Sequence, residues 1–396
     1  MRMVTRTAGV RGGRHQNQRD QDQRRRWRDQ LWFRVVAAAF AAFFLVVGWS
    51  IGHALTVPGG GSVSERMAEW ARDHYLSPLV TFGEWLSYSP PKKGGKPSFA
   101  LTGPSANVSS PPAGKKPTVS YGPPPPLKSP AGKPLPGEGK WRVLGTVDGN
   151  PAIYGTYLRS SSVYTSYVAG IASMNQSLLR FYLHPGAEDP GPGNWHTPPF
   201  IPPRMRNGLE ATFNSGFKIA VSGGGFYLNG TTRGSLTKGV ASEVYYKNGH
   251  MTIGVWGKTV HMTSQVAAVR QNLHLIVQNG KVPGSVDNNV ETAWGATLGG
   301  GYYVWRSGVG ITKDGRIIFA YGPALDVRGL ARVLREAGAV TAMQLDINPD
   351  WMSYEYYLPK HNPNNPTPEN LLPNQMQPAS HYYSPNSRDF TAVYGR

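Results

Sequence analysis

The sequence predicts an α+β fold that is mostly antiparallel sheet with few helices, preceded by one transmembrane helix and a Pro-rich linker. From Trp141 onward, Asp-Gly or Asn-Gly pairs such as Asp148-Gly149, Asn248-Gly249, Asn279-Gly280 and Asp314-Gly315 separate short strand-like runs. Such pairs favour tight hairpins because they tolerate positive φ. Long apolar strands that alternate with helices are missing, which argues against a doubly wound parallel sheet. A predominantly apolar run near the N-terminus is the third observation, since about 20 such residues cross a bilayer.

One stretch of the expected domain combines a hairpin, a helix and a strand. The hairpin is expected around Asp314-Gly315, and the helix at about 327–337, where Asp326 can cap the first turn. A short apolar strand, 339–345, follows and ends at Asp346. A carboxylate held at the end of a rigid strand is a common place for catalysis or binding.

The N-terminal region predicts membrane attachment. Residues 1–34 are rich in Arg and Gln and are predicted to be a basic, disordered cytoplasmic tail. Residues 35–57 are the predicted transmembrane signal anchor, and the arginines before them place the N-terminus in the cytoplasm. A cleaved signal peptide is the competing interpretation, but the long segment before the apolar run and the lack of an Ala-x-Ala site after it argue against it. We therefore expect a single-pass protein of the cell membrane with an extracytoplasmic C-terminal domain.

The rest of the chain divides by composition into three parts. Residues 58–88 are predicted to form a juxtamembrane helical segment. Residues 89–140 are rich in Pro, Gly and Lys, a composition that favours an extended, solvated spacer. Residues 141–396 are the expected folded domain, with a Pro/Asn-rich excursion at 359–385 and a last strand near 388–394.

Charge and cysteine content exclude several classes of function. The formal net charge of +18 would suggest nucleic-acid binding if it covered a folded face. Instead, residues 1–34 carry +7 and residues 88–142 carry +8, which leaves about +5 for residues 143–396. We therefore expect no nucleic-acid partner. Cysteine is absent, which excludes disulfides, thiolate metal sites and cysteine nucleophiles.

Common catalytic motifs are also absent. Zinc-ligand spacing, a P-loop and the Gly-x-Ser-x-Gly nucleophile elbow do not occur. Two glycine runs, Gly223–Gly225 and Gly299–Gly301, lack the following helix of a dinucleotide-binding fingerprint. We expect these runs to be tight turns or places where the backbone approaches a ligand.

Three motifs resemble those of the phosphodiester glycosidase family. Phe213–Lys218, followed by Gly223–Gly230, is similar to the family's Asn-Gly-Gly-Phe signature. Trp305–Gly310 resembles its Arg-Thr-Ala-x-Gly strand, and Leu345-Asp346 stands at the position of its Leu-Asp-Gly-Gly-Gly-Ser loop. The resemblance covers about residues 209–354. It implies hydrolysis of the bond between a sugar and a phosphodiester.

The chain departs from the family after Asp346. The glycine-rich loop is replaced by Ile347-Asn348-Pro349-Asp350-Trp351, a variant that resembles bacterial membrane-anchored members. It loses backbone amides that glycines would offer to a phosphate, and it gains a carboxylate and an aromatic ring. The substrate-binding residues that we expect are Asp350, Trp351, Asn348 and Gly216.

The reaction that the resemblance implies suggests three catalytic roles. A phosphomonoester leaves with little protonation, so the site needs a carboxylate beside the sugar and a cation for the phosphate. We expect Asp346 to be this carboxylate and Arg306 the cation, because its planar fork suits phosphate. Asn214 is expected to hydrogen-bond the sugar or to orient water. Structural roles stay open for each: a strand-end cap, a salt bridge closing the sheet and a turn cap, respectively.

The loop also resembles a calcium-binding loop in part. Asp346, Asn348 and Asp350 alternate oxygen ligands as such a loop does. However, Pro349 replaces a flexible spacer, and Glu355 comes two residues before the position of the last ligand. The sequence therefore predicts no cofactor and no metal site, and leaves a divalent cation near the two aspartates open.

Together these observations predict a membrane-anchored extracytoplasmic glycosidase that hydrolyses a sugar-1-phosphodiester in envelope glycans. Its partner would be an envelope glycan or a glycosyl phosphodiester. The alternative is a non-catalytic cell-envelope glycan-binding or scaffold module, which the altered loop, the basic linker and the 20 Tyr and 11 Trp residues favour. The sequence specifies neither the sugar nor its aglycone.

Overall fold

The computed structural model describes residues 12–56, 63–76, 80, 88–102, 122–287, 294–295, 302–359 and 362–396. The chain forms two compact units, Met1–Thr56 with Val63–Trp70, and Val57–Ser62 with Ala71–Arg396. Three predicted features lie outside the described residues: the start of the tail (1–11), the middle of the linker (103–121) and the glycine run at 299–301.

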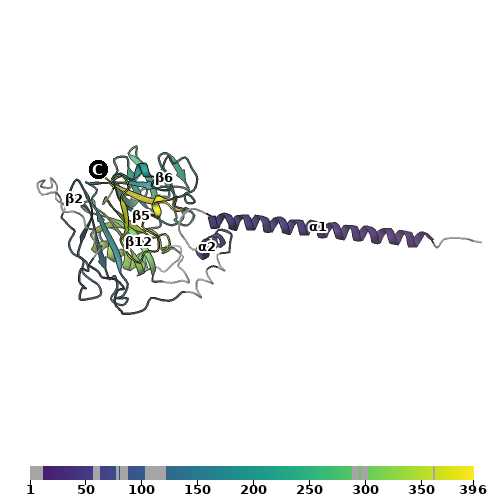
Figure 1. The fold of residues 1–396 in the computed structure, drawn as a ribbon, viewed down its shortest axis with the longest axis horizontal. Helices are drawn as coiled ribbons and strands as arrows, with labels where there is room; N and C mark the ends of the chain where they lie inside the picture. The colour runs from purple at the N-terminus through teal and green to yellow at the C-terminus, as the bar shows by residue number, and fades with distance from the viewer. Residues whose placement is uncertain are drawn as a thin grey trace, which may run out of the picture. The chain divides into compact units, whose positions relative to one another are not determined.

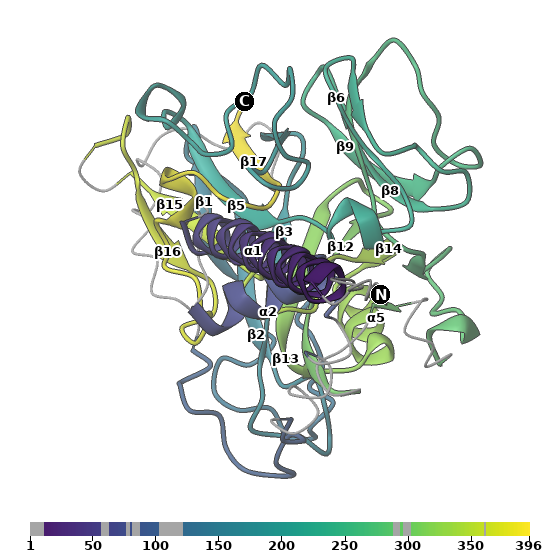
Figure 2. The ribbon, with the colours of Figure 1, turned by 90° about the vertical axis from the view of Figure 1, so that its right-hand side faces the viewer.

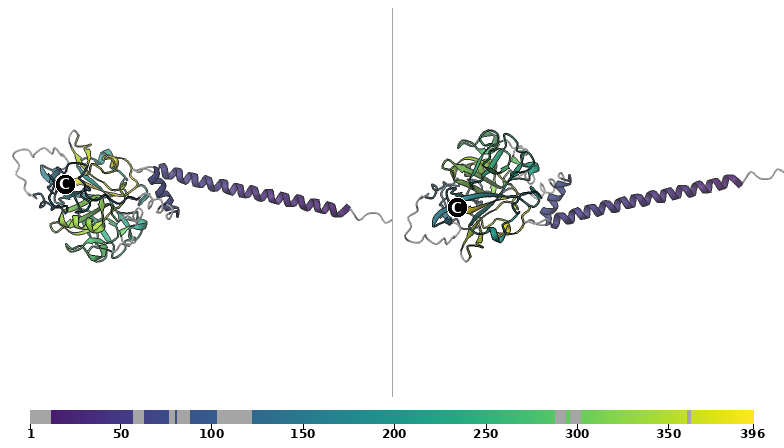
Figure 3. Two further views of the ribbon diagram at one scale, coloured as in Figure 1. Left: turned by 90° about the horizontal axis from the view of Figure 1, so that it is seen from below. Right: turned by 90° about the horizontal axis from the view of Figure 1, so that it is seen from above.

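The first unit contains the predicted membrane-spanning segment. Helix α1 (Gly12–Thr56) is one continuous helix (Figure 3). By length and composition, its Arg24–Thr56 part is apolar enough to cross a membrane, and its most apolar window has a mean hydropathy of 2.2. The helix includes residues 12–34, for which we expected disorder. Arg and Gln are good helix formers and no proline interrupts this segment, so the apolar helix can extend into it.

Helix α2 (Val63–Asp73) forms part of the predicted juxtamembrane segment. Trp70 Nε1 donates to Ser50 Oγ at 2.9 Å, and Arg66 donates to the carbonyl of Leu55 at 2.8 Å. The end of α1 therefore contacts α2 through side chains of the first unit.

The second unit is built from three antiparallel sheets. The seven-stranded sheet has the order β1-β2-β3-β13-β12-β14-β11, the β8 sheet has β7-β6-β10-β8-β9, and the β5 sheet has β16-β15-β5-β17-β4. Figure 2 shows the β8 sheet on one side of this unit and β15 and β16 on the other. The strands are β1 (Arg142–Val147), β2 (Asn150–Leu158), β3 (Ala169–Met174), β4 (Leu179–His184), β5 (Leu209–Asn214), β6 (Phe226–Leu228), β7 (Thr231–Arg233), β8 (Ala241–Tyr246), β9 (Met251–Val255), β10 (Val266–Gln271), β11 (Leu275–Val277), β12 (Val304–Thr312), β13 (Ile317–Leu325), β14 (Ala339–Gln344), β15 (Tyr354–Leu358), β16 (Thr367–Asn370) and β17 (Phe390–Gly395).

Helices are few in the described part of this unit, and the predicted fold class is confirmed. The long one is α5 (Val327–Glu336). The 3-10 helices are η1 (Pro203–Met205), η2 (Ile219–Val221), η3 (Gly284–Asp287) and η5 (His381–Tyr383). One hydrophobic core joins the three sheets and includes the fully buried Phe319, Phe226 and Phe213.

The predicted hairpin, helix and strand occur as expected. Strands β12 and β13 pair around the Asp314-Gly315 turn, and Asp326 caps α5 by accepting a hydrogen bond from the backbone N–H of Gly329. The apolar face of α5 covers one face of the seven-stranded sheet. A side chain at Gly308 of β12 would begin only 3.0 Å from Leu334 of α5. Glycine therefore allows the helix to pack closely on this strand.

The end of the predicted linker is folded onto the sheets. Leu127 is buried in the core beneath α5, and Glu138 forms a buried salt bridge with Arg159 at 2.9 Å. The backbone N–H of Arg159 also donates to Glu138 at 2.9 Å. Residues 122–140 are therefore held against the domain by a buried ion pair and apolar contacts.

The C-terminal segment returns to the β5 sheet. After the Pro/Asn-rich excursion, β17 runs between β5 and β4 and pairs with both. In Figure 1 the end of the chain, in yellow and marked C, lies near β5. Phe390 at its start lies opposite Asn214 at the end of β5. This register brings residues just before β17 to the same edge as Asn214.

Candidate active site

A small cavity lies where ends of the β5 sheet meet the end of β14. Asn214 ends β5, Asp346 follows β14, and Asp389 precedes β17. The cavity is lined by Asn214, Ser215, Gly216, Asp346, Asp350, Trp351, Gln377, His381, Tyr382, Asn386, Arg388 and Asp389. The structure thus brings together five of the seven predicted site residues, namely Asn214, Gly216, Asp346, Asp350 and Trp351.

Ser307 links two of these residues across the sheets. Its Oγ accepts hydrogen bonds from Asn214 Nδ2 at 3.0 Å and from the backbone N–H of Asp346 at 3.1 Å. Asn214 also donates to the carbonyl of Ser215 and accepts from the N–H of Ser353. The amide of Asn214 therefore connects the two sheets.

The Asp346 carboxylate is held by its own loop. Its Oδ1 accepts from the backbone N–H groups of Ile347 at 2.7 Å and Asn348 at 2.9 Å. Asn348 Oδ1 in turn accepts from the N–H of Asp350 at 3.0 Å, and Asn348 is not among the described residues that line the cavity. Two successive side-chain turns thus fix the loop. The amides that a glycine-rich loop would direct at a phosphate are bound internally here.

Arg306 is not among the described residues that line the cavity. Its guanidinium donates to the carbonyl of Leu325 at 2.9 Å and to Gln344 Oε1 at 2.8 Å, and burial lowers its pKa to about 10. The reason is the alternation of side chains along a strand. Gly308 faces α5, so Arg306 shares that face, whereas Ser307 faces Asn214 of the β5 sheet.

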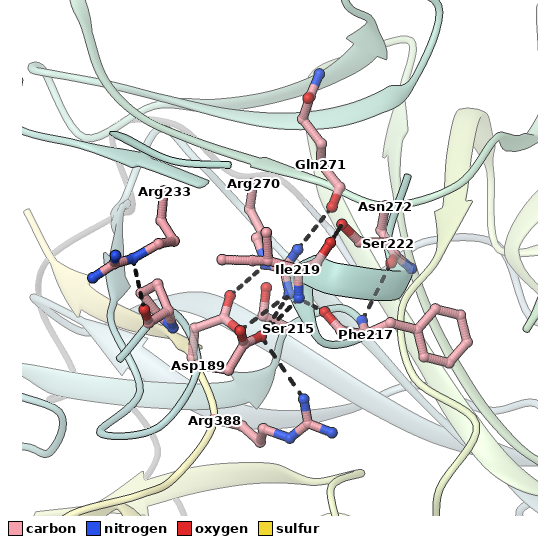
Figure 4. A network of polar contacts seen from close by, with 12 residues as sticks. Asp189, Ser215, Phe217, Ile219, Ser222, Arg233, Arg270, Gln271, Asn272 and Arg388 are labelled. Carbon is pink, nitrogen blue, oxygen red and sulfur yellow. Dashed lines mark hydrogen bonds and ion pairs between the residues drawn. The ribbon is translucent and has the colours of Figure 1, made fainter. Parts of the chain in front are cut away.

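Arg388 supplies a cation to the cavity instead. Its guanidinium carbon lies 5.1 Å from the centre of the Trp351 ring, and its Nη1 lies 3.8 Å from Asp189 Oδ2. Figure 4 shows Arg388 directed toward Asp189 from the opposite side to Arg270. One carboxylate therefore contacts both guanidinium groups, since Arg270 lies 3.9 Å from Asp189.

Arg270 anchors the cavity wall from within. It is fully buried and donates to Asp389 at 2.7 Å, and also to the carbonyl of Phe217 (Figure 4). Burial alone would lower the pKa of Arg270, but the neighbouring Asp389 and Asp189 raise it overall. Behind it, burial raises the pKa of Glu243 to about 8. The ion pair fixes the backbone on both sides of the cavity.

A second buried side chain fixes the loop that follows β5. Asn272 Oδ1 accepts from the N–H of Phe217 at 3.2 Å, while its Nδ2 donates to the carbonyls of Gln344 and Leu345. A Cβ at Gly216 would lie 2.8 Å from Asn272. Glycine is therefore required where this loop crosses toward the end of β14.

The Pro/Asn-rich excursion contributes the remaining wall. Gln377 donates to the carbonyl of Asp350 at 2.6 Å, and His381 Nδ1 lies 2.8 Å from the carbonyl oxygen of Pro378. Burial lowers the pKa of His381 to about 4. The imidazole is therefore neutral at neutral pH.

Sequence reasoning missed two groups of residues. Ser307 and Asn272 lie within stretches that carry the family resemblance, so strand alternation in those stretches could have indicated them. His381 and Arg388 lie in or just after a segment without periodicity, and no local signal marks them. Among the described residues, no cluster of three or more His, Asp or Glu side chains could hold a metal ion.

Comparison with known proteins identifies the domain. A family model described as phosphodiester glycosidase matches residues 207–346. The chain contains a phosphodiester glycosidase domain. Asn214, Gly216 and Asp346 lie within the matched residues of this domain, whereas the cavity residues from Asp350 to Asp389 lie outside them. No curated protein matches the sequence.

Solved structures give weaker similarity. The catalytic domain of zebrafish N-acetylglucosamine-1-phosphodiester alpha-N-acetylglucosaminidase is 12% identical, with a TM-score of 0.41, over 65% of this chain and 88% of that one. A hypothetical protein from Synechocystis is 10% identical, with a TM-score of 0.32, over 64% of each chain. A Burkholderia pseudomallei protein described as exported is 11% identical, with a TM-score of 0.24, over 58% and 74%. We transfer no residue roles from them.

Proposed function

We propose that this protein is a membrane-anchored, extracytoplasmic glycosidase that hydrolyses a sugar-1-phosphodiester in envelope glycans. The observation that carries the proposal is the cavity of the phosphodiester glycosidase domain, where Asp346 and Arg388 line the same walls. A carboxylate and a guanidinium are the two charges that cleavage of such a bond requires.

The reaction follows from these charges. The anomeric C–O bond breaks, its electron pair leaves with the phosphomonoester, and a water oxygen bonds to the anomeric carbon. Positive charge develops on the sugar ring, and Asp346 stabilises it electrostatically. The backbone N–H groups of Ile347 and Asn348 hold Asp346 in place for this role. One water proton passes to a base in the cavity.

Arg388 takes the phosphate-binding role that we expected of Arg306. Its side chain is 14% exposed, and its position over Trp351 is flanked by Asp189. A guanidinium binds phosphate oxygens in a bidentate manner, and the partly buried site strengthens that attraction. Trp351 then offers a ring face to the sugar or to the aglycone.

The N-terminal segment supports a reaction in the envelope. Helix α1 is long and apolar enough to span a bilayer, and the arginines at 24–34 favour a cytoplasmic N-terminus. Because the chain has no cysteine, single introduced cysteines report topology cleanly. A membrane-impermeant maleimide should label Lys258→Cys in intact cells and label Thr7→Cys only after lysis. Labelling of both positions in intact cells would contradict the proposed orientation.

The decisive experiment follows the oxygen of the attacking water. The full chain in detergent is incubated in ¹⁸O-labelled water with the methyl ester of N-acetylglucosamine 1-phosphate and of other sugar 1-phosphates. We expect ¹⁸O in the released sugar and an unlabelled methyl phosphate. Label in the phosphate would show a phosphodiesterase, and no turnover of any diester would overturn the glycosidase proposal. Adding EDTA or Ca²⁺ tests whether a divalent cation at Asp346 and Asp350 contributes.

One observation favours a second candidate, a glycan-binding module without turnover. The amides of Ile347 and Asn348 are bound to Asp346 and cannot cradle a phosphate. This candidate predicts saturable binding of envelope glycan by the full chain, lost in Trp351→Ala, with no sugar released.

A further inference from the structure

We propose that His381 is the base that accepts the proton of the attacking water, with its Nε2 as the accepting atom. This inference rests on the proposed glycosidase function and assigns the one role that Asp346 and Arg388 leave open. It stands on the tautomer that the surroundings of His381 enforce, on the rigidity of the ring and on its place in the cavity wall.

The hydrogen-bond partners of Nδ1 determine the tautomer. Nδ1 lies 2.8 Å from the carbonyl oxygen of Pro378 and 3.6 Å from Glu355 Oε1. A carbonyl oxygen only accepts hydrogen bonds, so Nδ1 must carry the proton. In a neutral imidazole the other nitrogen then has a free lone pair, which makes Nε2 the acceptor.

The ring is held in this orientation. His381 begins η5, its side chain is 8% exposed, and its ring centre lies 3.8 Å from that of Tyr382. Tyr382 is fixed by a 3.0 Å hydrogen bond to Ser353 Oγ, next to the residues that hold Asn214. A base with a locked rotamer keeps its lone pair aimed without a loss of entropy on substrate binding.

Glu355 is a positioning residue behind the ring. Its carboxyl group is fully buried and accepts from Thr212 Oγ1 and from Gln375 Nε2, each at 2.7 Å. Gln375 is fixed in turn by Tyr321. This network fixes the Glu355 carboxyl group 3.6 Å from Nδ1, and burial raises the pKa of Glu355 to about 8.

The charges around His381 suit a base that works only on bound substrate. In the free cavity, burial lowers the pKa of His381 to about 4. A bound phosphodiester adds a negative charge beside the ring, and a nearby negative charge raises the pKa of an imidazole. The titratable and charged groups that line the cavity with His381 are Asp346, Asp350, Tyr382, Arg388 and Asp389. Glu355 on β15 lies 3.6 Å from Nδ1 of the ring and is not among the described cavity residues.

The proton balance closes within the cavity. Water loses one proton to Nε2 as its oxygen bonds to the anomeric carbon. The anomeric C–O bond breaks, and the phosphomonoester leaves with the electron pair and a second negative charge. The imidazolium then returns its proton to a phosphate oxygen, which restores the neutral base before release.

The matched control is His184, a buried histidine with the same kind of Nδ1 contact. His184 Nδ1 lies 3.0 Å from the carbonyl of Pro198, and burial lowers the pKa of His184 also to about 4. His184 is not among the described cavity residues. His381→Asn keeps a donor for Pro378 but lacks Nε2, and we expect kcat to fall about 10²- to 10⁴-fold with little change in KM. His184→Asn should leave kcat of the folded fraction unchanged.

A spectroscopic measurement tests the tautomer independently of turnover. In ¹⁵N-histidine-labelled full chain, the signal lost in His381→Asn should show a protonated Nδ1 and an unprotonated Nε2. An Nε2–H tautomer overturns the inference, as does unchanged kcat in His381→Asn while the wild type releases sugar. Failure of the wild type on every diester instead overturns the glycosidase proposal and this inference with it. Added imidazole should restore part of the activity of His381→Ala.

Discussion

Two regions of different construction build the cavity. Asn214, Ser307 and Asp346 lie on strands or directly after them, and hydrogen bonds between two sheets fix their backbones. His381 and Arg388 lie on the segment between β16 and β17, which is held by a short 3-10 helix and by side-chain contacts. The strand ends position the carboxylate, and the C-terminal segment supplies the imidazole and the cation. The proposed chemistry therefore needs a part of the chain that lies beyond the family match.

Removing the carboxylate of the strand-borne region should have the largest effect. Asp346→Asn keeps an oxygen that accepts from Ile347 and Asn348, so the loop should keep its shape. We expect kcat to fall about 10³-fold, because the charge beside the developing oxocarbenium ion is lost. Thermal melting should stay within a few degrees of wild type. Asp314→Asn on the distant hairpin is the control, and near-full activity in Asp346→Asn would remove this region from the chemistry.

The two arginines separate the regions directly. Arg388→Gln should lower kcat/KM about 10²-fold, because a charge-assisted phosphate contact is lost at little cost to folding. Arg306→Lys should lower the stability of the fold and leave kcat/KM of the folded fraction nearly unchanged. It cannot satisfy both Leu325 and Gln344, and a buried acceptor left without a donor costs about 1–3 kcal/mol of stability. Kinetics on matched folded fractions and thermal melts check both variants. If Arg306→Lys lowered kcat/KM and Arg388→Gln did not, Arg306 would be the residue that binds the phosphate.

Variants of Ser307 test how much its hydrogen bonds to Asn214 and Asp346 contribute to activity. Ser307→Ala leaves the Asn214 amide and the Asp346 N–H without their acceptor, at a cost of about 1–3 kcal/mol. We expect kcat to fall roughly tenfold, because Asp346 is less firmly placed, with KM nearly unchanged. Ser307→Thr, which keeps the hydroxyl, is the control. Equal loss in both variants would point to packing rather than to the hydrogen bonds.

Local signals explain which parts could be predicted from the sequence. Turn chemistry at Asp314-Gly315 and the apolar face of 327–337 depend on nearby residues only, so the hairpin and helix were correctly located. The sequence points to Asp346 because a polar residue follows a buried strand, and the structure places it in the cavity wall. The choice between Arg306 and Ser307 required knowing which strand face α5 covers. That information lies in the tertiary structure, so the sequence favours Arg306, whose guanidinium suits phosphate.

The cavity residues between β16 and β17 show more clearly what could not be predicted from the sequence. The segment 359–385 lacks helical or strand periodicity, so the sequence predicts only a Pro/Asn-rich excursion there. Its contribution depends on the register between β17 and β5, which sets Phe390 opposite Asn214. Nothing local to His381 or Arg388 carries that information. Residues 12–34 illustrate the converse, because good helix formers next to an apolar helix continued it.

The smallest effect on turnover, and a distinct effect on stability, is expected at Glu243 behind the Arg270 ion pair. Burial raises its folded pKa to about 8, above the ordinary value of 4.5. The folded state therefore binds more protons than the unfolded state between pH 4.5 and 8. The stability from this group is complete below pH 4.5 and is lost as the pH rises through 8.

Glu243→Gln removes this titration while keeping the side-chain volume. The melting temperature of the wild type should fall more steeply from pH 5 to pH 8.5 than that of the variant, by at least about 2 °C, which corresponds to roughly 1 kcal/mol in a domain of this size. Glu336→Gln on α5, whose side chain is 46% exposed, should follow the wild type. Parallel curves for wild type and Glu243→Gln would show that Glu243 is ionised in the folded state. The Arg270–Asp389 ion pair would then have a further buried carboxylate beside it, and its own charges would not balance that negative charge.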